Sequence, residues 1–278
     1  MTIESSDTES DLDQARAARL TERFDHFAIR LLDQIAIVSI NRPDKLNSMT
    51  AAFWGQLRDL FAELESESDV RVVVITGAGD RAFSTGGDII GFAEPADICQ
   101  RREFMKSTME GFSAVENSPL AVIAAVNGWA LGGGCELTFA CDIVIAADTA
   151  EFGMPEASVG LVPGFGVLRA PSVIGNQWTK FMVFANERLS AEQAFRLGMV
   201  QKVVPAGELL PTAIELARKV AAQAPIAITL GKEIIGRGVD RSESRYAVEA
   251  LAVLFSTEDA AEGFAAFSDR RPPVFEGR

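Results

Sequence analysis

The sequence predicts an α/β protein whose last third is helical. Short apolar runs typical of buried strands alternate with segments of helical periodicity up to about residue 166. From about residue 167 onward the strand signal nearly vanishes and helical periodicity dominates. With 278 residues, 48% of them hydrophobic, the chain can form one large core with a smaller appended unit.

The first elements are predicted to be a tail, a hairpin and a helix. Residues 1–21 are acidic and polar, so we expect a flexible acidic tail. The runs "FAIRLL" and "QIAIVSI", separated by Asp33, indicate two paired strands. Thr50 is placed to cap a helix whose apolar residues share one face, namely Phe53, Leu57, Leu60, Phe61 and Leu64.

Strands and helices continue to alternate further along the chain. "VRVVVITG" predicts a buried strand, followed by a glycine-rich loop to Asp88, a helix near 96–116 and a strand at 120–126. Then "CELTFACD" indicates a short helix, "IVIAAD" and "AEFGMP" strands, and "GELLPTAIELARKVAAQA", "IAITLGKEIIGRG" and "SRYAVEALAVLFSTED" helices. We assign residues 22–205 to an α/β core with the active site and 206–278 to a C-terminal helical region.

Composition excludes several classes of function. No apolar run reaches the roughly 20 residues of a membrane helix, and the N-terminus lacks a basic segment followed by an apolar one, so we expect a cytoplasmic protein without membrane contact. The net charge of -13 disfavours nucleic acid as a partner. Three cysteines without ligand spacing predict reduced thiols and no metal site. His26 is the only histidine and no GxSxG occurs, so a Ser-His-Asp hydrolase lacks parts.

A dinucleotide-binding site is the first alternative to consider. "VVVITGAGDRA" satisfies the pattern G-x-G-x-x-A after a strand, through Gly77, Gly79 and Ala82. That site needs the glycine turn to open a helix, but "FSTGGD" follows at once and has poor helix propensity. No second strand ending in an acid follows either, so the pattern disfavours NAD binding.

Two glycine-rich segments, "AFSTGGDI" and "ALGGGCEL", each follow a buried strand. Taken alone, either is equally consistent with a loop whose glycines adopt positive φ values or let a strand pass close to a helix. Together they can expose two backbone N–H groups toward one point, which would form an oxyanion hole for a substrate carbonyl. The second segment precedes a helix, whose N-terminus adds partial positive charge.

Two carboxylates are the candidate proton carriers. Glu136 lies in the first turn of the predicted helix, where an acid also interacts favourably with the helix dipole without any catalytic role. Glu156 follows Pro155 after a strand, and one short helix and two strands separate it from Glu136. If the two converge in a dry pocket, repulsion and desolvation raise their pKa values toward neutrality, as proton transfer requires.

These segments resemble the enoyl-CoA hydratase/isomerase, or crotonase, superfamily. The resemblance runs through "INRPDKLNSMT", "VVVITGAGDRAFSTGGDI", "VIAAVNGWALGGGCELTFACDIVIAA", "FGMPEASVGLVPG" and "AEGFAAFSDRRPPVF", over about residues 25–276. It implies a crotonase-like spiral of β-β-α repeats with a C-terminal helical oligomerisation region, in a homotrimer or a dimer of trimers. The implied substrate is an acyl-CoA thioester, with no cofactor.

The resemblance also implies roles for particular residues. Gly87 and Gly133 would supply the oxyanion amides, Glu136 the base toward water and Glu156 the proton to C2 of a trans-2-enoyl-CoA, giving a 3-hydroxyacyl-CoA. Further substrate contacts are expected at positions along the matching motifs, namely Lys45, Leu46, Thr85, Asp88, Ile89, Gly164 and Arg270. The family's motif after Gly164 is replaced here by "FGVLRAPSVIG", so Phe165 is expected to reshape the acyl pocket.

Other activities on the same scaffold remain open. A Δ3-Δ2 enoyl-CoA isomerase would need only Glu156, and hydrolase, decarboxylase and dienoyl variants are further alternatives. An RNA-binding relative without enzyme activity would be expected to carry a lysine-rich helix. The helix at 50–66 has only Arg58 against several acids, which argues against that function.

Overall fold

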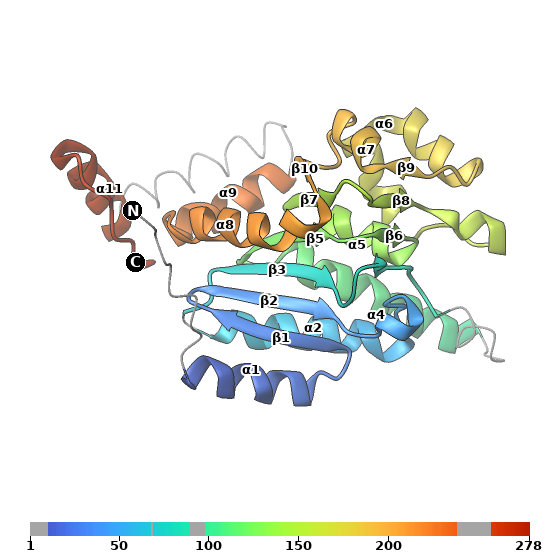
Figure 1. Cartoon of the computed structure of the whole chain (residues 1–278), viewed down its shortest axis with the longest axis horizontal. Helices are drawn as coiled ribbons and strands as arrows, with labels where there is room; N and C mark the ends of the chain where they lie inside the picture. Colours follow the sequence, from blue (N-terminus) through green and yellow to red (C-terminus); the bar gives the residue numbers. More distant parts are fainter. Residues whose placement is uncertain (1–10, 68, 89–97, 238–256) are drawn as a thin grey trace.

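The computed structural model describes residues 11–67, 69–88, 98–237 and 257–278 (Figure 1). Its centre is a six-stranded sheet in the order β1-β2-β3-β5-β7-β10. The first pair is antiparallel and every later pair is parallel. The strands are β1 Phe27–Leu32, β2 Ile35–Ile40, β3 Val72–Gly77, β5 Ala121–Val126, β7 Ile143–Ala147 and β10 Lys202–Val204.

A second, smaller sheet has the order β4-β6-β8-β9. Its strands are β4 Ala82–Ser84, β6 Trp129–Leu131, β8 Glu151–Gly153 and β9 Leu189–Ser190. The first three are parallel neighbours, and β9 is antiparallel to β8. Along the chain, β3 and β4, β5 and β6, and β7 and β8 each place one strand in the large sheet and the next in the small sheet before a helix follows. The expected spiral of β-β-α repeats is therefore confirmed.

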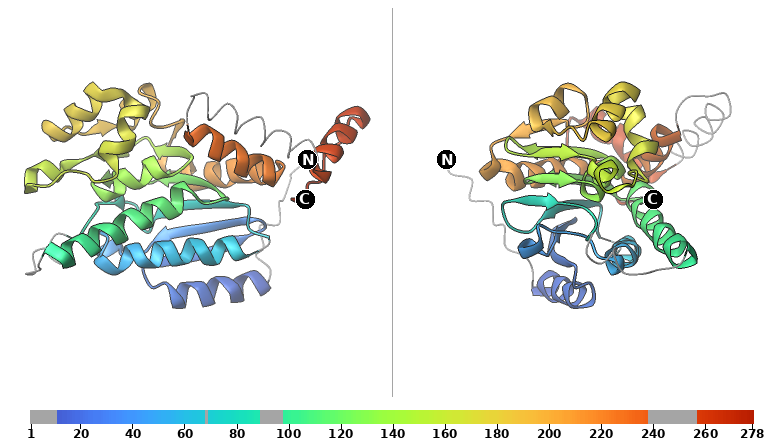
Figure 2. Two further views of the ribbon diagram at one scale, coloured as in Figure 1. Left: turned by 180° about the vertical axis from the view of Figure 1, so that it is seen from behind. Right: turned by 90° about the vertical axis from the view of Figure 1, so that its right-hand side faces the viewer.

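Helices cover both faces of the large sheet. Alternate strand residues such as Val73 and Ile75 join a core with the helices α2 (Ala51–Ser66) and α4 (Ile98–Glu116), which lie side by side in Figure 2. Val72 and Val74 point to the opposite face, because successive side chains of a strand alternate. That face is covered by the small residues of α8 (Leu209–Ala221), so the core extends beyond residue 205.

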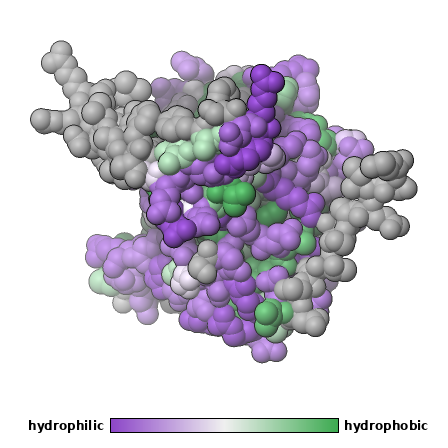
Figure 3. All heavy atoms as spheres, turned by 90° about the vertical axis from the view of Figure 1, so that its left-hand side faces the viewer, coloured by the Kyte–Doolittle hydropathy of each residue, from purple (hydrophilic) through white to green (hydrophobic). Residues whose placement is uncertain are grey.

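Further helices and 3-10 turns complete the fold. They are α5 Gly133–Ala140, α6 Gly166–Phe184, α7 Ala191–Arg196, α9 Pro225–Arg237 and α11 Glu258–Asp269, with the 3-10 turns η1 Pro43–Lys45, η2 Pro155–Val159 and η3 Ala206–Glu208. The helix expected over "SRYAVEALAVLFSTED" lies mostly outside the described residues. The face of the molecule near α11 is mainly hydrophilic (Figure 3), in keeping with the charge of -13.

The expected flexible tail is wrong from residue 11 onward, where helix α1 (Asp11–Arg23) begins; residues 1–10 lie outside the described part. Ala17 and Leu20 lie one turn apart on a single face and are buried against β1. The polar side of α1 forms ion pairs with α2 and the residues after it, between Arg16, Arg19 and Arg23 on one side and Glu63, Glu67 and Asp69 on the other.

Four short strands differ from the sequence-based prediction. β4, β6, β9 and β10 have two or three residues each, which is too short for an alternating pattern to be recognised. β4 lies in the predicted glycine-rich loop, and β9 and β10 lie in the region where helices were expected. Thr50 does precede α2, but its hydroxyl bonds His26 Nε2 at 2.7 Å rather than capping the helix. After β3 the glycine turn leads into β4, not into the helix that a dinucleotide site needs.

Candidate active site

The site is built where three parallel strands of the small sheet end. In β4, β6 and β8 the last residues are Ser84, Leu131 and Gly153, and the strands pair in that order. Parallel neighbours carry their following loops to the same edge of a sheet. The residues two or three positions after these strand ends are Gly87, Gly133 and Glu156. The topology therefore gathers at one edge three segments that are distant in sequence.

Gly87 is held by a single parallel bridge to Met49. The N–H of Met49 donates to the carbonyl of Gly86 at 2.8 Å, and the N–H of Asp88 donates to the carbonyl of Met49 at 2.8 Å. Because successive backbone groups of an extended chain alternate in direction, the N–H of Gly87 points away from Met49. This geometry leaves that amide available to a ligand.

Gly133 is the first residue of α5, so its N–H has no acceptor within the helix and lies at the positive end of the helix dipole. A Cβ on Gly86 would lie only 2.8 Å from the nitrogen of Gly133, so the peptide that contains the Gly87 amide adjoins it. Gly86 also has φ of +82°, which favours glycine. The peptide between Gly86 and Gly87 therefore lies against the N-terminus of α5.

Glu136 is 6% exposed and has fixed hydrogen-bond donors. Its Oε1 accepts from the N–H of Phe165 at 2.8 Å and from the N–H of Gly166 at 2.7 Å, where α6 begins. Burial raises the pKa of Glu136, and the two N–H groups act in the opposite direction. A Cβ on Gly166 would lie 2.8 Å from Sδ of Met154 and 3.2 Å from Cγ of Glu136, so the glycine lets the start of α6 approach Glu136 closely.

Glu156 lies in the 3-10 turn after β8. Burial and, second, the negative charge of Glu136 raise the pKa of Glu156 to about 7. Its Oε1 lies 3.1 Å from the place a Cβ of Gly132 would occupy, and its Oε2 is buried without a hydrogen-bond partner. The structure therefore brings the two carboxyl groups together beside the glycine turn.

Four of the other predicted contact residues lie in the loop from 42 to 49 or in the first glycine segment. Leu46 and Thr85 adjoin the site, since the N–H of Thr85 donates to the carbonyl of Leu46 at 3.1 Å. Lys45 is exposed in the turn before Leu46. Asp88 forms an ion pair with Arg42 at 3.3 Å. The segment from 42 to 49 thus lies directly against the first glycine segment.

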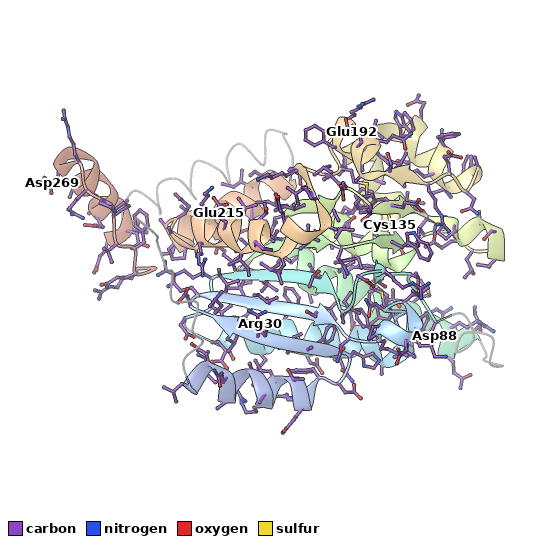
Figure 4. All side chains as sticks on the ribbon, in the orientation of Figure 1. Arg30, Asp88, Cys135, Glu192, Glu215 and Asp269 are labelled. Carbon is purple, nitrogen blue, oxygen red and sulfur yellow. The ribbon has the colours of Figure 1, made fainter. Side chains whose placement is uncertain are left out.

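Three predicted positions remain. A Cβ on Gly164 would lie 3.4 Å from Cε of Met105, so this residue faces α4. Ile89 lies outside the described residues. Arg270 follows α11 directly, and Figure 4 shows the neighbouring Asp269 at the opposite end of the molecule from Asp88. Within one chain, Arg270 is therefore not part of the site.

Sequence reasoning missed three features of the site. The backbone N–H groups that donate to Glu136 belong to Phe165 and Gly166. In the sequence, only the glycine at the start of a helix pointed to this contact. Arg42, which also donates to the carbonyl of Ser48 at 2.8 Å, braces the loop that carries Gly87. Trp54 of α2 abuts Gly133, with 3.4 Å between its Cζ2 and the position of a glycine Cβ.

Within the described part of the chain, no group of three or more His, Cys, Asp or Glu side chains is placed to hold a metal ion. Cys99, Cys135 and Cys141 form no disulfide bond with one another in the structure. Figure 4 shows Cys135 on α5, next to Glu136 in sequence; burial and the two glutamates raise the pKa of its thiol well above the usual range. None of the described helices is long and apolar enough to cross a membrane.

Comparison with known proteins identifies the family. The chain is 38% identical over 242 residues to a short-chain-enoyl-CoA hydratase of Clostridium acetobutylicum, covering 86% of this chain and 92% of the relative. It is 35% identical over 257 residues to a crotonyl-CoA hydratase of Syntrophomonas wolfei, covering 91% and 98%. The crystal structure of an enoyl-CoA hydratase from Bacillus anthracis superposes with a TM-score of 0.87 at 35% identity, covering 91% of this chain and all of that one. Because the model of the enoyl-CoA hydratase/isomerase family also matches residues 31–278, the chain belongs to this family.

Proposed function

We propose that the protein is an enoyl-CoA hydratase, a hydro-lyase that adds water across the double bond of a trans-2-enoyl-CoA to give a 3-hydroxyacyl-CoA. The observation that carries this function is the pair of carboxyl groups, Glu136 and Glu156, whose pKa values are raised beside two available amides. The hydratase relatives and the family membership support the same reaction and a place in fatty acid metabolism.

The amides of Gly87 and Gly133 would hold the thioester oxygen. Their donation withdraws electrons from the conjugated system, so C3 becomes electrophilic and the enolate charge is stabilised. Loss of one such donor typically costs about 10²–10³ in rate. The helix α5 contributes its positive N-terminal end to the second amide.

The two glutamates would divide the proton transfers between them. Glu136 accepts two backbone N–H bonds, which favour its anionic form, so it is suited to remove a proton from the attacking water. Glu156, with a pKa of about 7, retains a proton near neutrality and can deliver it to C2. The oxygen of the water bonds to C3 and keeps one proton as the new hydroxyl group, and the other proton goes to Glu136. Afterwards Glu136 loses this proton to solvent and Glu156 regains one.

The loop from 42 to 49 is proposed to hold the CoA part. Lys45 is exposed and cationic, so it is proposed to bind a phosphate group of coenzyme A. Leu46 is half-buried next to Thr85 and is proposed to contact the pantetheine arm. Gly164, Asp88 and Ile89 are proposed to line the acyl end. The reaction uses carboxyl groups and amides, so we propose that no cofactor takes part and that coenzyme A enters only as substrate.

We also propose a homotrimer or a dimer of trimers in the cytoplasm. Support comes from large apolar side chains exposed just after η2 and along α6, namely Leu161, Val162, Leu168, Trp178, Phe181 and Phe184. A neighbouring subunit is the proposed place where Arg270 reaches a CoA phosphate. Sedimentation equilibrium would test this, since a monomeric mass in dilute solution contradicts it.

The test of function uses purified protein with crotonyl-CoA and longer trans-2-enoyl-CoA thioesters, following loss of the conjugated absorbance. We expect turnover in the wild type and losses of at least about 10²-fold in both Glu136→Gln and Glu156→Gln. Glu103→Gln, at an exposed position of α4, is the matched control. If only Glu156→Gln loses activity and 3-enoyl thioesters are preferred, the protein is an isomerase and the proposal is wrong.

A further inference from the structure

Glu136, the proposed base, depends on a backbone segment that has little stiffness of its own. Its Oε1 accepts from the N–H groups of Phe165 and Gly166. Two donors on one oxygen fix the rotation of the carboxyl group, and therefore the direction in which Oε2 points. Phe165 has a glycine on each side, Gly164 and Gly166, and glycine leaves the backbone more freedom than any other residue. The side chain of Phe165 is thus the nearest anchor for both donor peptides.

The ring of Phe165 has two partners that can hold it. It is 1% exposed and stacks on Phe112 of α4, with 4.7 Å between the ring centroids. The guanidinium group of Arg169, in the first turn of α6, lies over the same ring at 5.1 Å from its centroid. The backbone N–H of Arg169 also donates to the carbonyl of Phe165 at 3.2 Å. A contact made by Arg169 is therefore transmitted to Phe165 over a single helical turn.

Arg169 is fixed to α4 by Glu116, the last residue of that helix. The guanidinium group donates two hydrogen bonds to the carboxylate, from Nε to Oε1 and, at 2.8 Å, from Nη2 to Oε2. Two such bonds fix the orientation of the guanidinium plane as well as its distance. Phe112 lies one turn before Glu116 on α4. The aromatic stack and the ion pair are therefore two neighbouring contacts that hold the start of α6 against α4.

We propose that Arg169 is a positioning residue for the hydration reaction: it holds Phe165 so that the backbone N–H groups at the start of α6 stay aligned on Glu136. Glu116 keeps the guanidinium group in the orientation that this requires. The proposal deepens the hydratase function proposed above and rests on it. Arg169 acts through the backbone of α6, and Glu136 itself carries out the proton transfer.

The alignment of these N–H groups has a consequence for the pH dependence of the reaction. Burial raises the pKa of Glu136, and the two N–H groups at the start of α6 lower it, so loss of their alignment should raise it. Two further titratable groups adjoin Glu136, namely Glu156 of η2 and Cys135 of α5. The charged groups on α6 and α4 are Arg169 and Glu116, which neutralise each other. Since Glu136 must be ionised to accept a proton from water, the acidic limb of the kcat/KM profile reports its pKa.

The first experiment measures kcat and KM for crotonyl-CoA as a function of pH in wild type, Arg169→Met and Glu116→Met. Arg169→Met should lower kcat about 10- to 100-fold, leave KM within about 3-fold, and move the acidic limb of kcat/KM up by about 1 pH unit. The alkaline limb, which Glu156 sets, should stay at about pH 7. Because the side chains of the ion pair are 42% and 26% exposed, the pair contributes little to global stability and both variants should fold.

Glu116→Met distinguishes positioning from a direct effect of charge. Removal of a negative charge would by itself lower the pKa of Glu136 and move the acidic limb to lower pH. Release of Arg169 from its partner should instead move the limb to higher pH, in the same direction as Arg169→Met. The matched controls are Arg58→Met and Glu110→Met, because these residues join α2 to α4 by an ion pair at 3.1 Å with similar exposure. The controls should leave both limbs unchanged.

A second measurement needs no substrate. In protein labelled with ¹³C at the glutamate carboxyl groups, the signal that disappears in Glu136→Gln belongs to Glu136, and its titration gives the pKa directly. We expect its midpoint to lie about 1 pH unit higher in Arg169→Met and in Glu116→Met than in wild type. The proposal is overturned if either variant leaves the midpoint unchanged or lowers it, or if activity falls while the acidic limb stays in place. Wild-type protein whose variants shift as expected but that does not hydrate crotonyl-CoA contradicts the proposed function alone.

Discussion

Replacing Glu156 with glutamine is expected to make the folded protein more stable at neutral and alkaline pH. Burial and the Glu136 charge raise the pKa of Glu156 from 4.5 to about 7. A group with a raised pKa in the folded state holds its proton there after the unfolded chain has lost it. The stability that this proton provides is complete below about pH 4.5 and is lost as the pH rises to about 7. That shift corresponds to about 3 kcal/mol, and glutamine does not ionise.

The measurement is the free energy of unfolding by urea, for wild type and Glu156→Gln, at several values between pH 4.5 and 8. We expect the difference, variant minus wild type, to rise by about 2–3 kcal/mol across this interval and to level off above it. Glu103→Gln, at an exposed position on α4, should give a difference that stays nearly constant. Parallel curves for Glu156→Gln would show that the two carboxyl groups do not share a desolvated site.

Three further outcomes are expected. The kcat/KM for hydration should fall as the pH rises through about 7, because Glu156 then loses the proton that it has to donate. A value of kcat/KM that stays level up to pH 9 contradicts the role of Glu156 as acid. Gly134→Ala should cost about 1–3 kcal/mol in urea unfolding and most of kcat, because its Cβ would lie 2.2 Å from the carbonyl oxygen of Ser84; unchanged stability would contradict the packing. Arg42→Lys should lower kcat about 10-fold in steady-state assays, because a lysine cannot brace both Ser48 and Asp88; an effect on KM alone would show that the loop only binds substrate.

The sequence predicted the elements whose burial leaves a strong pattern. β3 and β5 are covered on both faces and therefore appear as unbroken apolar runs, and α2 carries one apolar face. Helix α1 was missed because its apolar contribution is small and its stability includes ion pairs with α2, which are tertiary contacts. β6 and β10 have three residues each, and pairing with neighbours, not local propensity, defines them.

For the site, the glycine segments and the two acids carried signals that could be recognised from chemistry. The groups that shift the pKa of Glu136 could not be recognised in this way, because they are the backbone N–H groups of Phe165 and Gly166, which every residue except proline possesses. Trp54 is one of the apolar residues of α2, and the sequence gives no sign that its ring packs against Gly133. Such partners depend on how α4, α5 and α6 meet.

The three short strands β4, β6 and β8 also make enzyme activity a reporter of strand alignment. Each delivers one part of the site from its end, and none has more than three residues to fix its pairing. Slippage of one strand by a single residue would displace its part by about 3.3 Å, farther than a hydrogen bond to the substrate tolerates. During refolding, catalysis should therefore return only after all three strands have reached their native pairing, later than signals that detect helix formation alone.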